Sequence, residues 1–161
     1  SSGELVDKPE WKTKESWLHW DQNVWSEPDF CQVQGFVALT DHTIKSGGFA
    51  CIPGFHKEFK EWGENHPVDT IEGGSTTQVP CFLPSDTPLK ERVRAITMPK
   101  GACIIWDSRL PHQNYPNDNE SFRMVQYIKY SKAESGDVFL KKKTNLVEKL
   151  KSGIGGDVFP N

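Results

Sequence analysis

The sequence lacks long apolar runs and an excess of positive charge. No stretch approaches the ~18 consecutive apolar residues of a membrane span, and the first residues form no hydrophobic leader segment. The 19 Lys and Arg residues are outnumbered by 22 Asp and Glu residues, which leaves a net charge of −3. One basic run occurs, at residues 141–143, and a solvated helix face explains it. We therefore expect neither a membrane nor a nucleic acid as a partner.

Closely spaced cysteine pairs are missing as well. The four cysteines, Cys31, Cys51, Cys81 and Cys103, lie far apart and form no C-x-x-C motif, which argues against a zinc ribbon or a redox dithiol. Each has apolar neighbours, as is usual for buried thiols. This distribution favours a reducing compartment such as the cytoplasm, although the sequence alone leaves two disulfides open.

The chain shows no alternation of strands with helices and no internal repeat. Its 161 residues suit one domain with a substantial core. Short β-prone segments are separated by turns at roughly the 8–12-residue spacing of sandwiches and barrels. These segments are residues 17–22, 31–41, 49–52, 92–98, 102–107 and 122–130. The pattern predicts a mainly β fold, a two-sheet jelly roll or cupin-like double-stranded β-helix, with a few peripheral helices.

Three parts are expected along the chain: a polar arm at residues 1–16, a core at 17–131 and a C-terminal extension at 132–161. The extension contains a short predicted helix at residues 144–151, and a second helix is predicted at 56–64. The segment at 102–107 is expected to be a mostly buried strand. Residues 65–88 are rich in Gly, Ser, Thr and Pro, which indicates a long loop that is either a lid over a site or a solvated surface segment.

The predicted site is built around His19 and Asp21. Side chains two positions apart in an extended segment point to the same face, so these two share a face while Trp20 turns away. One imidazole and one carboxylate make two thirds of the facial triad that holds a non-haem iron and leaves other positions open. A salt-bridged pair on a surface strand is the alternative, and the pair alone does not decide between them.

Three other histidines compete for the third ligand position, and His66 in the long loop is a weaker candidate. His42 ends a strand, where a solvent-facing or capping side chain is common. His56 begins the predicted helix and is expected to cap it. His112 lies much later, in a polar loop between two strong strands, and jelly rolls bring such distant strands side by side.

Arg123 favours His112, because it follows eleven positions later inside an apolar strand. A buried guanidinium costs several kcal/mol unless it meets an anion, and its planar fork suits a carboxylate. A small dicarboxylate can chelate iron through a keto-acid group at one end and meet Arg123 at the other. A salt bridge from Arg123 to a protein Asp or Glu is the alternative.

The ordered motifs are H-W-D at 19–21, G-G-F-A-C-I-P-G-F-H at 47–56, G-A-C-I-I-W-D at 101–107, then His112 and Arg123. Together, over residues 17–130, they resemble the phytanoyl-CoA dioxygenase-like (PhyH) branch of the iron(II)/2-oxoglutarate oxygenases. In that family a Gly-rich segment ending in P-G-x-H follows the His-x-Asp strand, and a distal His and an Arg complete the site.

The resemblance implies a role for each matching residue. Three of them match the iron ligands: His19, Asp21 and His112. Arg123 matches the residue that binds the distal carboxylate of 2-oxoglutarate. Asn114, two positions after the distal histidine, falls where members of the family place a polar residue near that same carboxylate. His56 matches a motif histidine that is not a ligand.

The resemblance also implies Fe(II) as cofactor and 2-oxoglutarate and O2 as co-substrates. The implied reaction hydroxylates a C–H bond of a small molecule while 2-oxoglutarate is decarboxylated to succinate. Halogenating relatives carry a small residue in place of the carboxylate ligand, so Asp21 favours hydroxylation. Members usually have a long segment ahead of the His-x-Asp strand, whereas 18 residues precede His19 here. The chain is then either a minimal version or the C-terminal part of a longer protein.

Other classes of protein explain the residues less well. A cupin-type metalloenzyme needs a His-x-His pair, which this sequence does not contain. A zinc hydrolase can use two His and one Asp, but it leaves Arg123 unexplained. A non-catalytic jelly-roll module that binds a small molecule, or an inactive fragment of an oxygenase, is the main alternative. The sequence indicates neither the substrate nor the oligomeric state.

Overall fold

The computed structural model describes residues 13, 17–84, 87–131 and 148. The chain falls into two compact units, Ser1–Tyr130 and Ser131–Asn161, and the first contains the candidate site. The arm predicted at 1–16 and the helix predicted at 144–151 lie outside the described residues, apart from Thr13 and a helical Glu148. The predicted domain boundaries therefore stay predictions.

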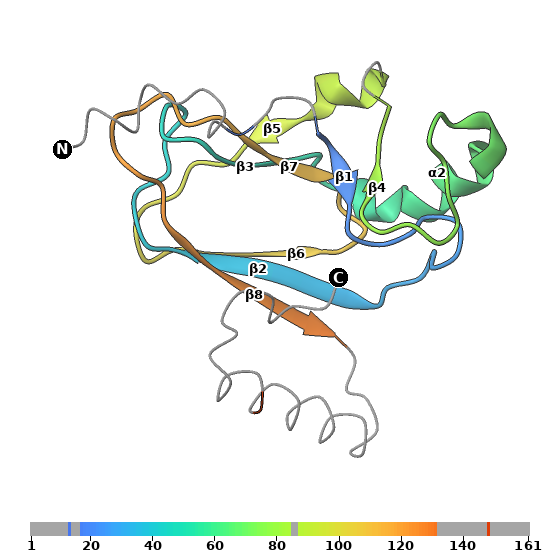
Figure 1. Cartoon of the computed structure of the whole chain (residues 1–161), viewed down its shortest axis with the longest axis horizontal. Helices are drawn as coiled ribbons and strands as arrows, with labels where there is room; N and C mark the ends of the chain where they lie inside the picture. Colours follow the sequence, from blue (N-terminus) through green and yellow to red (C-terminus); the bar gives the residue numbers. More distant parts are fainter. Residues whose placement is uncertain (1–12, 14–16, 85–86, 132–147, 149–161) are drawn as a thin grey trace. The chain divides into compact units, whose positions relative to one another are not determined.

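Within the described residues, eight strands form two sheets that lie one above the other (Figure 1). The strands are β1 (His19–Trp20), β2 (Gln32–Ala38), β3 (Gly48–Cys51), β4 (Cys81–Phe82), β5 (Arg94–Ala95), β6 (Cys103–Asp107), β7 (His112–Tyr115) and β8 (Val125–Ser131). The five-stranded sheet has the order β4-β1-β7-β3-β5, and the three-stranded sheet has the order β6-β2-β8. The pairs of β1 with β4 and β7, of β3 with β5 and β7, and of β2 with β6 are antiparallel. The predicted two-sheet, mainly β architecture is confirmed.

The helix predicted at 56–64 is confirmed as the 3-10 turn η2 (Phe55–Lys57) followed by α2 (Phe59–Asn65). Two further 3-10 turns are η3 (Val68–Thr70) and η4 (Pro88–Arg92). The apolar side of η2 and α2 packs on the ring of Trp20, which lies 5.7 Å from Phe55, 5.5 Å from Phe59 and 4.9 Å from Trp62. No helix among the described residues combines the length and hydrophobicity that crossing a bilayer requires.

Aromatic side chains fill the space between the sheets. Phe36 of β2 lies 6.0 Å from both Phe49 of β3 and Trp106 of β6, and the last two rings lie 4.5 Å apart. All three are buried, and each contributes roughly 1.5–3 kcal/mol through its burial. Because Phe49 and Trp106 also contact the imidazole of His112, the core supports the side chain that the sequence places in the site.

Several strand predictions were wrong in detail. The loop predicted at 65–88 contains β4, which pairs with β1, and the loop predicted around His112 contains β7. The strand β6 is not mostly buried, because it is covered on one face only. Ile104 and Trp106 pack on the core, whereas Cys103 and Ile105 are exposed. All four cysteines are free thiols, and Cys103 corrects the expectation that each of them is buried.

Candidate metal centre

The pairing of β1 with β7 brings the first and last predicted ligands together. His19 and His112 are direct cross-strand partners, although they lie far apart in the sequence. Directly opposed residues in an antiparallel pair hold their side chains close on one face. Their imidazole rings accordingly lie 4.5 Å apart, centroid to centroid, and each residue is only 6% exposed.

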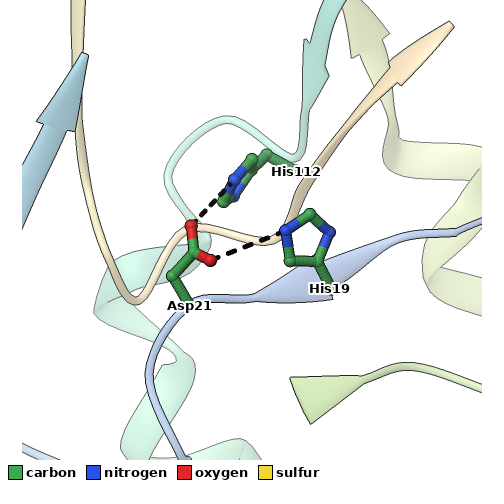
Figure 2. Close-up of side chains that lie close together, drawn as sticks. All are labelled: His19, Asp21 and His112. Atoms are coloured by element: carbon green, nitrogen blue, oxygen red, sulfur yellow. Dashed lines mark ion pairs between the residues drawn. The ribbon is translucent and has the colours of Figure 1, made fainter. Parts of the chain in front are cut away.

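Asp21 completes the cluster from the bend that follows β1 (Figure 2). Its Oδ2 lies 3.1 Å from Nε2 of His112, and its Oδ1 lies 3.7 Å from Nε2 of His19. Ligand atoms of these three residues all lie within 4.8 Å of one another. Among the described residues, this is the cluster of three His, Cys, Asp or Glu side chains that can hold a metal ion. Two imidazoles with one carboxylate are the ligand set of a facial triad.

Both imidazoles are oriented by main-chain carbonyls. Nδ1 of His19 lies 3.1 Å from the carbonyl oxygen of Trp17, and Nδ1 of His112 lies 2.9 Å from that of Leu110. A carbonyl oxygen only accepts, so Nδ1 donates in both rings, and the Nε2 atoms, which carry a lone pair when the ring is neutral, face Asp21. Metal-binding histidines are usually held in this way, and the donor set therefore fits a metal ion.

Aromatic rings surround the two imidazoles. The indole of Trp17 stacks on His19 at 4.9 Å with an angle of 14° between the planes, and Phe82 lies 5.7 Å from the same ring. His112 is packed between Phe49 at 5.6 Å and Trp106 at 5.1 Å. These walls lower the local dielectric and limit the ring positions that either imidazole can take.

Burial sets the protonation of the cluster. Desolvation, and then the neighbouring His112, lower the pKa of His19 to about 4, so its imidazole is neutral at pH 7. Burial alone raises the pKa of the Asp21 carboxyl, but the hydrogen bond and charge of His112, with smaller contributions from His19 and Gln34, outweigh it. The pKa of Asp21 therefore lies below its ordinary value. A neutral His19 and an ionised Asp21 are the forms that bind a metal.

The metal-free protein is expected to lose stability as the pH falls from 6.5 to about 4, the ordinary and folded pKa values of His19. In this window the unfolded chain binds more protons than the folded one, so stability rises with pH by on the order of 3 kcal/mol. Thermal melts at pH 7 and pH 4.5 measure the loss. A His19→Gln variant should lose less, and an equal loss in both proteins would contradict the assignment. Asp21 acts only at lower pH, because its pKa lies below its ordinary value of 3.8.

The structure brings together the two residues predicted to bind the co-substrate. Arg123 Nη1 and Nη2 donate to Oδ1 of Asn114 at 3.3 and 3.2 Å, and the guanidinium carbon lies 5.8 Å from the ring centre of Phe36. Arg123 precedes β8 rather than lying inside it, and its neighbours Phe122 and Met124 are exposed. Among the described residues, no Asp or Glu forms an ion pair with Arg123, so the predicted alternative of a protein salt bridge finds no support there.

The other histidines lie outside the cluster. His42 is 2% exposed, which corrects the expectation of a solvent-facing side chain, and it packs 5.5 Å from the ring of Phe36. His56 lies within η2 and does not cap α2, whose N-cap is Glu58 without a side-chain hydrogen bond. His66 stacks on Trp62 at 4.3 Å and has a structural role.

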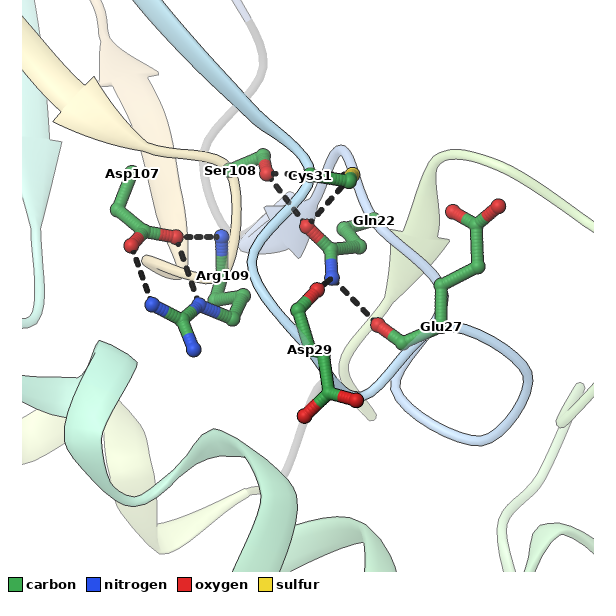
Figure 3. Close-up of polar contacts among 7 residues, drawn as sticks. All are labelled: Gln22, Glu27, Asp29, Cys31, Asp107, Ser108 and Arg109. Atoms are coloured by element: carbon green, nitrogen blue, oxygen red, sulfur yellow. Dashed lines mark hydrogen bonds and ion pairs between the residues drawn. The ribbon is translucent and has the colours of Figure 1, made fainter. Parts of the chain in front are cut away.

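The glutamine next to Asp21 is a further residue of the site that the sequence pattern did not indicate. Gln22 is fully buried and ties three segments together (Figure 3). Its Nε2 donates to the main-chain carbonyls of Glu27 and Asp29, while its Oε1 accepts from the Ser108 hydroxyl and the Cys31 thiol. Because both ends of the amide are satisfied, Gln22 fixes the main chain beside Asp21. A buried glutamine leaves no periodic pattern in the sequence from which it could be found.

The fold, together with the side chains of His19, Asp21 and His112, defines a jelly-roll protein with a candidate metal centre. The family model described as Phytanoyl-CoA dioxygenase (PhyH) matches residues 6–125, well over half of the chain. The chain belongs to this family, and the predicted resemblance is confirmed.

A curated relative carries the same family name, and two solved structures share the fold. A Dictyostelium discoideum protein named "Putative phytanoyl-CoA dioxygenase" is 31% identical over 110 residues, which are 68% of this chain and 30% of that protein. EctD from S. alaskensis, solved with 2-oxoglutarate and 5-hydroxyectoine, is 22% identical with a TM-score of 0.51, covering 74% of this chain and 39% of EctD. The α-ketoglutarate-dependent carbocyclase SnoK from nogalamycin biosynthesis is 20% identical with a TM-score of 0.51, covering 79% of this chain and 49% of SnoK. The chain thus spans under half the length of each, and the likeness confirms the predicted double-stranded β-helix.

Proposed function

We propose that this chain contains the catalytic core of an Fe(II)/2-oxoglutarate-dependent dioxygenase that hydroxylates a C–H bond of a small molecule. The observation that carries the proposal is the meeting of two oriented Nε2 atoms with the Asp21 carboxylate in a buried site. In this proposal His19, Asp21 and His112 bind the iron. When bound, iron with 2-oxoglutarate and O2 supplies the oxidising chemistry that protein side chains lack.

The pair of Arg123 and Asn114 supports 2-oxoglutarate as co-substrate. Arg123 is half-buried, is free of carboxylate partners among the described residues and holds its guanidinium against Asn114. A distal carboxylate can accept from the two Nη groups and from the Asn114 amide, which at present lies 3.5 Å from the Tyr127 hydroxyl. The EctD structure that shares this fold was solved with 2-oxoglutarate.

The carboxylate ligand favours hydroxylation. In the proposed ligand set, Asp21 occupies the coordination position that a halide would otherwise take. The set therefore favours hydroxylation over halogenation. The aromatic walls formed by Trp17, Phe49 and Trp106 shield the site from water. The substrate is a small molecule in this proposal, and a cytoplasmic location remains a prediction.

Anaerobic titration with Fe(II) and then with 2-oxoglutarate tests the proposal. A weak visible charge-transfer band should appear when 2-oxoglutarate is added to the iron-loaded protein, and 2-oxoglutarate should raise its melting temperature. In air, 2-oxoglutarate should be converted to succinate. If no band forms and 2-oxoglutarate gives no thermal protection, the chain is a non-catalytic binding module or an inactive part of an oxygenase.

A further inference from the structure

Two glutamines of β2 hold Asp21 from the opposite sheet. Gln32 and Gln34 are two positions apart on this strand, so both point to the same face. Nε2 of Gln32 donates to the main-chain carbonyl of Asp21 at 3.2 Å, and Nε2 of Gln34 donates to Oδ2 of Asp21 at 2.6 Å. The strand β2 belongs to the three-stranded sheet, whereas Asp21 follows β1 of the five-stranded sheet.

Strand pairing alone does not fix the Asp21 carboxylate. The strand β1 ends at Trp20, and its registers with β4 and β7 involve His19 and Trp20 but not Asp21. An aspartate side chain turns about two bonds, and its terminal torsion is broad. The hydrogen bond from Gln34 restricts this rotation. The hydrogen bond from Gln32 holds the main chain from which the side chain projects.

A neutral amide is suited to this task because it donates a hydrogen bond without carrying a charge. A Lys or Arg in its place would form an ion pair with the carboxylate and repel a metal cation. The Gln34 amide orients the Asp21 oxygen and leaves the negative charge of the carboxylate available to a metal. Outer groups that orient a metal ligand in this way typically change metal affinity 10–100-fold.

We propose that Gln34 is a positioning residue that orients Asp21 for metal binding, while Gln32 holds the adjoining main chain. The inference rests on the proposed function, because it requires Asp21 to be a metal ligand. It adds a contribution from the three-stranded sheet to a site whose three ligand residues lie on or next to strands of the five-stranded sheet.

The test measures binding of Co2+ alone, because the visible absorption of this ion reports both affinity and coordination. Gln34→Met keeps the length of the side chain and removes the donor. It should bind Co2+ about 10–100-fold more weakly than the unaltered chain, with a changed absorption spectrum at saturation. The matched control is Gln126→Met on β8, where the exposed side chain donates, among the described residues, to the Tyr127 carbonyl. This variant should keep the affinity and the spectrum of the unaltered chain.

Melting curves of the metal-free proteins verify that the variants fold. If Gln34→Met does not fold, Gln34→Asn replaces it. The asparagine amide lies one methylene farther from Asp21, so this variant should show the same weaker Co2+ affinity and changed spectrum. Unaltered Co2+ affinity and spectrum in the folded variant would overturn the positioning role while leaving the proposed function intact. An unaltered chain that binds no Co2+ would overturn both.

Discussion

Replacing His112 by alanine is expected to weaken metal binding strongly. The variant loses one of three proposed ligands, and the remaining pair, His19 and Asp21, offers a weaker and less constrained site. Loss of an outer partner alone costs 10–100-fold, so loss of a ligand should weaken Fe(II) or Co2+ binding by more than about 100-fold. The charge-transfer band with 2-oxoglutarate and any succinate formation should disappear with it. Titration followed by absorption measures both.

The control must separate loss of a ligand from the cavity that truncation creates. His42→Ala removes another buried histidine, 2% exposed, that lies outside the cluster. It should unfold at a lower temperature, as a cavity variant does, and still bind Co2+ like the unaltered chain. If His112→Ala binds the metal as tightly as His42→Ala does, His112 is not a ligand.

Replacing Arg123 by alanine is expected to weaken 2-oxoglutarate binding while leaving metal affinity unchanged. Removing one partner of a hydrogen-bonded, desolvated charge pair costs 2 kcal/mol or more, which corresponds to a loss of about 30-fold or more. The guanidinium contacts Asn114 and Phe36 but none of the three proposed metal ligands. Calorimetric titration of the metal-loaded protein with 2-oxoglutarate measures the loss.

A second arginine provides the matched control for charge. Arg92 is half-buried and pairs with Glu58 through two hydrogen bonds at 2.8 and 2.6 Å. Arg92→Ala removes the same charge and should bind 2-oxoglutarate like the unaltered chain. Arg123→Lys keeps the charge but loses the planar fork, so its affinity should fall between the two. A parallel loss of metal and 2-oxoglutarate affinity in Arg123→Ala would instead indicate a structural role.

The sequence was sufficient to predict the features that depend on the local pattern of residues. Short β-prone and apolar segments bounded by turns predicted most strands, and the spacing of His19 and Asp21 predicted their common face. The strand β7 was missed because its residues, His-Gln-Asn-Tyr, are mostly polar and carry weak strand propensity. Its place between β1 and β3 makes it a strand, and that place depends on pairing with distant segments.

Contacts between the sheets could not be predicted in the same way. Arg123 was expected within an apolar strand, but its half-buried position arises from Asn114 and Phe36, which belong to β7 and β2. The contact of Gln34 with Asp21 likewise joins two strands of different sheets. Neither contact follows from local periodicity, because each depends on how the two layers are stacked.

The cross-strand register of His19 with His112 has a consequence for how the chain folds. The two residues are 93 positions apart (112 − 19), so an ion bound to both closes a loop of that length. An ion that binds only the folded chain does not cross-link the unfolded one, so it would stabilise the fold by mass action, by about 2.7 kcal/mol at a free concentration about 100 times its Kd. A bound ion would link the early and late segments of the chain reversibly. Since β7 must insert between β1 and β3, an ion could bind both histidines only after that insertion, which would make metal binding a late event in folding.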